Sequence, residues 1–224
     1  MQIGGLQKFS LMDYPGKISS ILFTVGCNFS CPYCYNSDLV LSKTKIIEDK
    51  KILEFLEKRK GLIEGVVITG GEPTLQSDLA DFIKKIKNMG YSVKLDTNGS
   101  RPETLEKVIK NIDYVAMDIK TPLEKMNIVS DKDFSQQIKE SINTIMKSGI
   151  DYEFRITAYP LLDEKDYEKM FSMIKGAKKL AIQQFVKQNL LCKEAEKLEP
   201  RKTRFLEEMA LKAGKYVKKV ELRV

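Results

Sequence analysis

The chain has 224 residues, of which 42% are hydrophobic and 31% charged, and this predicts one domain, residues 1–224, around a single core. No apolar run reaches the roughly 20 residues that span a membrane, no secretory leader is expected, and the absence of histidine removes the usual general base near neutral pH. The net charge of +7 comes from lysines spread over amphipathic stretches without alternating aromatic residues, which indicates a solvated surface and argues against nucleic-acid binding.

Apolar, β-branched runs alternate with helical patterns along the chain. Strands are predicted at residues 18–25, 65–69, 91–96, 113–119, 151–158 and 180–186, with a final strand within 216–224. Apolar residues recur at helical spacing within residues 79–89, 105–109, 134–145 and 167–174. The run Ser100-Arg101-Pro102-Glu103 predicts a capping box at the start of the second of these helices.

This alternation predicts an α/β protein with a parallel sheet and right-handed crossovers. Six such units suit a partial (β/α)6 TIM-type barrel, in which ligands bind at the carboxyl ends of the strands. The unusual segments all follow predicted strands. They are the run from Cys27 to Cys34, Gly70-Gly71-Glu72-Pro73, Asp96-Thr97-Asn98-Gly99 and Asp118-Ile119-Lys120. We therefore expect them to share one site.

Three of the four cysteines, Cys27, Cys31 and Cys34, have C-x3-C-x2-C spacing. In a reducing cytoplasm, the expected location, clustered cysteines indicate metal ligands rather than disulfides. Three thiolates can hold three irons of a [4Fe–4S] cluster and leave the fourth iron open. The alternatives are cysteines without metal and a structural zinc site, which needs four ligands although only Cys192 remains as a further thiol. Cys192 itself is expected to be an incidental or structural thiol.

The cysteine run followed by Gly70-Gly71-Glu72-Pro73 resembles the radical S-adenosylmethionine (radical SAM) enzymes, so the barrel is expected to be a radical SAM core. The resemblance covers nearly the whole chain. Residues 9–17, 93–99, 115–120, 149–155 and 183–185 are similar to the activating enzymes of glycyl-radical enzymes. Within that group the chain most resembles the activator of anaerobic ribonucleoside-triphosphate reductase and its pyruvate formate-lyase-activating relatives.

The resemblance implies one [4Fe–4S] cluster on Cys27, Cys31 and Cys34, with SAM bound at the open iron. It implies reductive cleavage of SAM and formation of a radical on a glycine of a partner protein. A small electron donor of the flavodoxin or ferredoxin type is expected, and no membrane partner. The residues expected to contact SAM are Tyr33, Cys34, Tyr35, Gly70, Gly71, Glu72, Asp96, Asp118, Lys120 and Arg155. Asp96 and Thr97 are also expected to coordinate a monovalent cation, as in pyruvate formate-lyase activators.

Simpler interpretations of these residues remain open. The two glycines could form a plain tight turn, Asp118 and Lys120 a surface ion pair, and Asp96 and Thr97 a cap for the next loop. Tyr35 stands where many relatives carry histidine, and the later histidine that pyruvate formate-lyase activators direct toward SAM is also absent. Two other functions also remain open: a radical SAM enzyme for a small molecule, and a non-catalytic metal-binding module.

Overall fold

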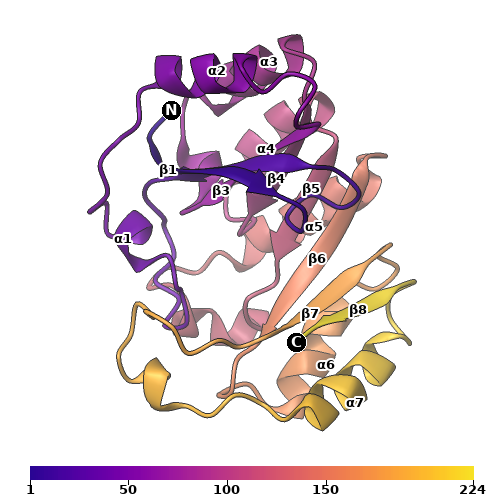
Figure 1. Cartoon of the computed structure of the whole chain (residues 1–224). Helices are drawn as coiled ribbons and strands as arrows, with labels where there is room; N and C mark the ends of the chain where they lie inside the picture. The colour runs from indigo at the N-terminus through magenta and orange to yellow at the C-terminus, as the bar shows by residue number, and fades with distance from the viewer.

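The computed structural model describes all 224 residues and contains one eight-stranded sheet with helices packed against it (Figure 1). The strands follow one another across the sheet in chain order. They are β1 (Ile3–Ser10), β2 (Ser19–Thr24), β3 (Gly65–Gly70), β4 (Ser92–Thr97), β5 (Tyr114–Asp118), β6 (Asp151–Ala158), β7 (Leu180–Gln184) and β8 (Val220–Arg223). β1 is antiparallel to β2, and every later pairing is parallel. The predicted α/β class and parallel sheet are confirmed.

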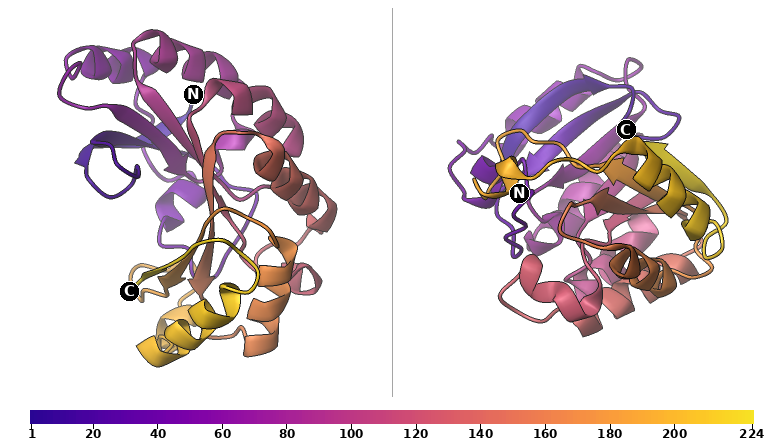
Figure 2. Two further views of the ribbon diagram at one scale, coloured as in Figure 1. Left: turned by 90° about the vertical axis from the view of Figure 1, so that its right-hand side faces the viewer. Right: turned by 90° about the horizontal axis from the view of Figure 1, so that it is seen from below.

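The sheet does not close into a full barrel, since β1 and β8 form its two edges. In the left view of Figure 2 these edges lie apart, and the helices follow the opposite, outer side. This open curvature is the partial TIM-type barrel that the sequence predicts. It leaves one face of the sheet without a helical layer.

The helices are crossover connections between successive strands. The longer ones are α2 (Asp49–Glu57), α3 (Leu79–Asn88), α4 (Pro102–Val108), α5 (Ser135–Lys147), α6 (Glu164–Met173) and α7 (Thr203–Ala213). The shorter ones are α1 (Ser37–Val40) and the 3-10 turns η1 (Pro73–Leu75), η2 (Ile109–Asn111), η3 (Leu123–Ile128) and η4 (Ala195–Lys197). None of the helices combines the length and the apolar character that a membrane crossing requires.

Several local features differ from the sequence-based prediction. β1, α2 and α7 lie where no element is predicted; β1 contains Gly4 and Gly5, which weaken the strand pattern, and it is positioned by pairing with β2. The predicted capping box is wrong: Arg101 is the N-cap of α4 and makes no side-chain cap bond. The Ser100 hydroxyl instead bonds to the amide of Asn28, at 2.8 Å from its Nδ2 atom. A contact across two loops therefore replaces the local cap.

The two faces of the sheet differ in character because side chains alternate along each strand. Val93 and Leu95 of β4 belong to the main core of 49 residues beneath the helices. The opposite face carries a small apolar cluster that includes Val67 and Tyr114. Lys94 lies on this inner face beside Tyr114, its register partner on β5. By the same alternation, the inner face carries the charged side chains Lys94 and Asp96 of β4, Asp118 of β5, and Glu153 and Arg155 of β6.

Candidate functional site

The cysteine loop follows β2 and is held by backbone hydrogen bonds from three directions. The carbonyl of Gly26 accepts from the N–H of Glu72 after β3, at 2.8 Å. The N–H of Ser30 donates to Val129 at the end of η3, at 2.8 Å. The N–H groups of Leu191 and Cys192, between β7 and α7, donate to the carbonyls of Cys34 and Pro32 at 2.8 and 3.2 Å. The loop is therefore part of the folded framework.

The three thiols of this loop lie within electrostatic range of one another. Burial raises the pKa of Cys27 to about 11 and that of Cys31 to about 12. For Cys27 the nearby Glu72 adds to the effect, whereas for Cys31 the Lys120 ammonium opposes it. Iron binding would replace these protons, because the thiolate is the form that ligates metal.

The hydrogen-bond donors around the thiols suit an iron–sulfur cluster. The backbone N–H of Phe29 lies 3.4 Å from the Cys27 sulfur, and the side-chain amide of Asn98 lies 3.9 Å from it. Hydrogen bonds from such N–H groups to cluster sulfurs help to set the reduction potential of the cluster. No three Cys, Asp or Glu side chains are grouped around one point as ligands of a single ion. A four-iron cluster instead binds each thiolate to a different iron.

Gly70 and Gly71 allow the β3 turn to lie directly against the end of β2. Gly70 has a φ of +109°, and a Cβ there would come within 2.5 Å of the backbone nitrogen of Thr24. A Cβ on Gly71 would lie 2.0 Å from the carbonyl oxygen of Gly26, next to Cys27. The glycines therefore allow contact between two loops of this chain, a role that the sequence pattern alone does not reveal. Their contact with SAM stays a prediction.

Glu72 is fully buried and connects the turn after β3 to the loop after β4. Its carboxylate accepts from the N–H and hydroxyl of Thr74, from the Thr97 hydroxyl at 2.8 Å and from the Asn98 N–H at 2.6 Å. Burial raises its pKa, although these hydrogen bonds oppose that effect. The predicted contact with the SAM ammonium is untested, and both carboxylate oxygens already have partners within the chain.

The charged residues predicted from β4, β5 and β6 form one connected row. Arg155 donates from Nε to Asp118 at 2.8 Å and from Nη1 to Asp96 at 2.9 Å. Lys120 pairs with Asp118 at 3.2 Å, and Lys94 pairs with Asp96. Burial alone would raise the pKa of the Asp118 carboxyl, but Arg155 and Lys120 hold it well below its usual range. The row is therefore a connected ionic network that is buried at Lys94 and Asp96 and partly exposed at Asp118 and Lys120, and Asp118 and Lys120 are not an isolated surface pair.

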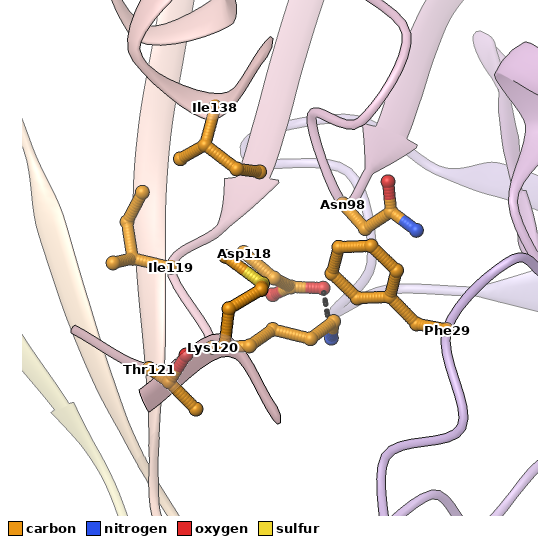
Figure 3. A pocket seen from close by; sticks show the side chains of 8 residues that line it. Phe29, Asn98, Asp118, Ile119, Lys120, Thr121 and Ile138 are labelled. Carbon is orange, nitrogen blue, oxygen red and sulfur yellow. Dashed lines mark hydrogen bonds and ion pairs between the residues drawn. The ribbon is translucent and has the colours of Figure 1, made fainter. Parts of the chain in front are cut away.

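Figure 3 shows a small pocket between the cysteine loop and the ends of β4 and β5. Asp118 and Lys120 lie on one side of it, and Phe29 and Asn98 on the other. The hydroxyl of Thr121, which also lines the pocket, is buried and has no hydrogen-bond partner. The predicted residues at the ends of β4 and β5 thus meet the cysteine loop.

The two tyrosines of the cysteine run lie in different environments. Tyr33 is buried, its ring centroid lies 4.6 Å from that of Tyr159, and its hydroxyl donates to the Lys120 carbonyl at 3.2 Å. Tyr35 is 68% exposed. Tyr35 is therefore accessible to a ligand, whereas the Tyr33 ring is already packed. Adenine contacts by either residue stay predictions.

Four further residues contribute to this site although none is among the residues expected to contact SAM or the cluster, and only Asn98 lies in a run expected there. Asn98 bonds to Asn28 at 3.1 Å and so links the β4 loop to the cysteine loop. Lys94 neutralises one oxygen of Asp96 from within the strand. Leu191 and Cys192 cover the cysteine loop through their backbone, whereas the Cys192 sulfur contacts Glu194. Two signals were available in the sequence: Asn98 stands in the run after β4, and alternation along β4 places Lys94 on the face of Asp96.

Comparison with known proteins identifies relatives of the whole chain. The family model described as "Radical SAM superfamily" matches residues 21–174. A Methanocaldococcus jannaschii protein named "Putative glycyl-radical enzyme activating enzyme" is 36% identical over 99% of this chain and 95% of its own length. The pyruvate formate-lyase-activating enzyme of Clostridium pasteurianum is 34% identical over 53% of this chain and 52% of its own. The crystal structure of Streptococcus suis SuiB superposes with a TM-score of 0.67 at 12% identity, over 91% of this chain and 48% of SuiB, and supports the fold alone.

Proposed function

Because the chain belongs to the radical SAM superfamily, we propose that it is an activating enzyme that generates a glycyl radical on a partner protein. The observation that carries this proposal is the meeting of the cysteine loop with the Gly70-Gly71-Glu72 turn and the ends of β4 and β5. Similarity to a relative named as an activating enzyme, over 99% of this chain, supports the choice of reaction.

Cys27, Cys31 and Cys34 would hold the [4Fe–4S] cluster, and SAM would bind beside them. When bound, these groups supply one-electron cleavage of the SAM sulfonium and a 5′-deoxyadenosyl radical that removes a hydrogen atom from a glycine Cα. The chain contains no histidine, and this hydrogen-atom transfer requires no proton-shuttling base. The protein has to bind, orient and shield the reacting groups.

The chain's own residues would orient SAM by charge and shape. Lys94, Arg155 and Lys120 outnumber Asp96 and Asp118 by one positive charge, and this excess suits the carboxylate of the methionine moiety. The backbone at Gly71 and Glu72 lies against the cysteine loop, where it can receive the methionine end. Tyr35, which is exposed, is available to the adenine.

We further propose that the partner is an anaerobic ribonucleotide reductase and that a small flavodoxin or ferredoxin supplies the electron. The open sheet supports a protein substrate, because β1 and β8 are its edges and do not pair to close the barrel around the site. A cytoplasmic location is part of the proposal, because the cluster and the glycyl radical both need reducing, anaerobic conditions.

The test is anaerobic. The protein is reconstituted with iron and sulfide, reduced, and mixed with SAM and the anaerobic ribonucleotide reductase of the same organism. We expect 5′-deoxyadenosine and an electron paramagnetic resonance doublet from the reductase, and neither signal from a reductase whose target glycine is replaced by alanine. If 5′-deoxyadenosine forms and the reductase carries no radical, the proposed partner is wrong.

A further inference from the structure

Both oxygens of the Asp96 carboxylate are paired with cations that belong to the chain itself. Arg155 donates from Nη1 to Oδ2 at 2.9 Å, and the Lys94 ammonium contacts Oδ1. Lys94 is 2% exposed and Asp96 9% exposed, so solvent does little to screen the pair. The expected monovalent cation would have to coordinate this same carboxylate.

Thr97, the other expected ligand of that cation, is also engaged. Its hydroxyl donates to Glu72 at 2.8 Å and accepts from the Gly99 N–H at 3.1 Å. A metal ion at Asp96 would lie close to the Lys94 ammonium, and like charges at that separation in a buried site repel strongly. The residues present therefore do not fit a monovalent metal ion.

We propose that the Lys94 ammonium supplies the positive charge at Asp96 that the expected metal ion would otherwise supply. Lys94 acts as a positioning residue: it fixes Asp96, which holds Arg155, which in turn holds Asp118 at the edge of the pocket. The effect on SAM rests on the proposed function, whereas the effect on cation binding does not.

The backbone explains why a lysine can be accommodated here. Lys94 and Asp96 are two residues apart on β4, so both side chains lie on the inner face. The Lys94 ammonium lies 6.0 Å from the centroid of the Tyr114 ring on the neighbouring strand, a distance at which the ring face attracts a cation. The Asp96 carboxylate and the Tyr114 ring thus offset the free-energy cost of removing the Lys94 ammonium from water.

The experiment compares SAM affinity and melting temperature of the reconstituted protein in sodium, potassium and choline chloride at equal ionic strength. Choline is too large to replace a coordinated metal ion. We expect the wild-type values to be the same in all three salts. A wild-type protein that needs sodium or potassium for full SAM affinity would overturn the proposal without any variant.

Lys94→Met should create a cation requirement. In choline chloride we expect the SAM affinity of this variant to fall about tenfold, which corresponds to a loss of about 1.4 kcal/mol of binding free energy. The affinity should recover when sodium or potassium is added. The melting temperature of this variant should rise with sodium or potassium, since an ion that binds only the folded state stabilises it. Lys94→Arg, which keeps the charge, should remain independent of the cation.

Lys179→Met is the matched control. Lys179 is another lysine of the inner face, with a side chain 18% exposed; it pairs with Glu153 at 3.0 Å and Glu221 at 2.9 Å but lies outside the network around Asp96. This variant should lose stability without gaining a cation requirement. If Lys94→Met folds and is as indifferent to sodium and potassium as Lys179→Met, the proposal fails. The melting data decide this even if no partner protein accepts a radical.

Discussion

Gly71→Ala should damage the cysteine loop more than Gly90→Ala, a substitution far from that loop. The new Cβ would lie 2.0 Å from the Gly26 carbonyl oxygen, whereas real Cβ contacts essentially never fall below 3.0 Å. The two backbones would have to separate by about 1 Å, the difference between these distances. That shift would stretch two hydrogen bonds of 2.8 Å, from Gly71 N–H to Thr24 and from Glu72 N–H to Gly26.

The expected loss follows from these contacts. Two backbone hydrogen bonds contribute about 0.5–1.5 kcal/mol each, and overpacking costs about 1–3 kcal/mol, so the free energy of unfolding should fall by about 2–6 kcal/mol. For a chain of this size that lowers the melting temperature by roughly 5–20 °C. Because the displaced segment precedes Cys27, the iron content after reconstitution should fall as well.

Gly90→Ala provides the matched control for this variant. Gly90 has a φ of +92°, and a Cβ there meets nothing within 4 Å. Only backbone strain of about 1–2 kcal/mol is expected, with normal iron content. Unfolding by urea and iron analysis are the two measurements. The reasoning is refuted if Gly71→Ala binds as much iron as the wild type and is no less stable than Gly90→Ala.

The remaining predictions concern other contacts. Cys31→Ala should abolish iron–sulfur absorbance and SAM cleavage. Cys192→Ala should change neither, because the hydrogen bonds of Cys192 to the cysteine loop come from its backbone, whereas its sulfur contacts Glu194. Equal absorbance of the two variants would contradict the ligand assignment. Glu72→Gln should lower the free energy of unfolding, measured by urea titration, by about 2–4 kcal/mol, because one amide oxygen replaces two carboxylate oxygens that face four donors. An unchanged urea midpoint would show that the carboxylate is dispensable. Glu153→Gln should cost about 3 kcal/mol at neutral pH, because it leaves Arg223 without its buried partner. Arg223 holds the Glu153 pKa below its usual value against the effect of burial, so this stabilisation is complete above about pH 4.3 and is lost as the pH falls further. A difference between wild type and Glu153→Gln that stays constant from neutral to acidic pH would contradict that sign.

The elements that could be predicted from the sequence are those whose signal is local. The run from Val66 to Ile68 and the helical spacing from Leu79 to Ile86 each bury a continuous apolar surface, so pattern and structure agree. Thiol spacing likewise identifies the cysteine loop, because three neighbouring cysteines have few other uses in a reducing compartment.

The features that could not be predicted depend on partners distant in sequence. Ser100 fits a capping box, but its hydroxyl bonds to Asn28, 72 residues away. Glu72 could have faced a ligand, yet Thr97 and Asn98 occupy its oxygens. Alternation along β4 places Lys94 on the face of Asp96, but its contact with Tyr114 depends on the register of β4 and β5. These contacts depend on how strands and loops are arranged in space, and the residue pattern of one segment does not show that arrangement.

The most direct measurement uses a partner reductase whose glycines carry deuterium at Cα. After one anaerobic turnover with reduced protein and SAM, mass spectrometry of the 5′-deoxyadenosine reports where its new hydrogen came from. The proposed function predicts one deuterium per 5′-deoxyadenosine, in proportion to the glycyl radical on the partner, and none with the Cys31→Ala variant. 5′-Deoxyadenosine that contains no deuterium, formed at the same rate with or without the partner, would contradict it.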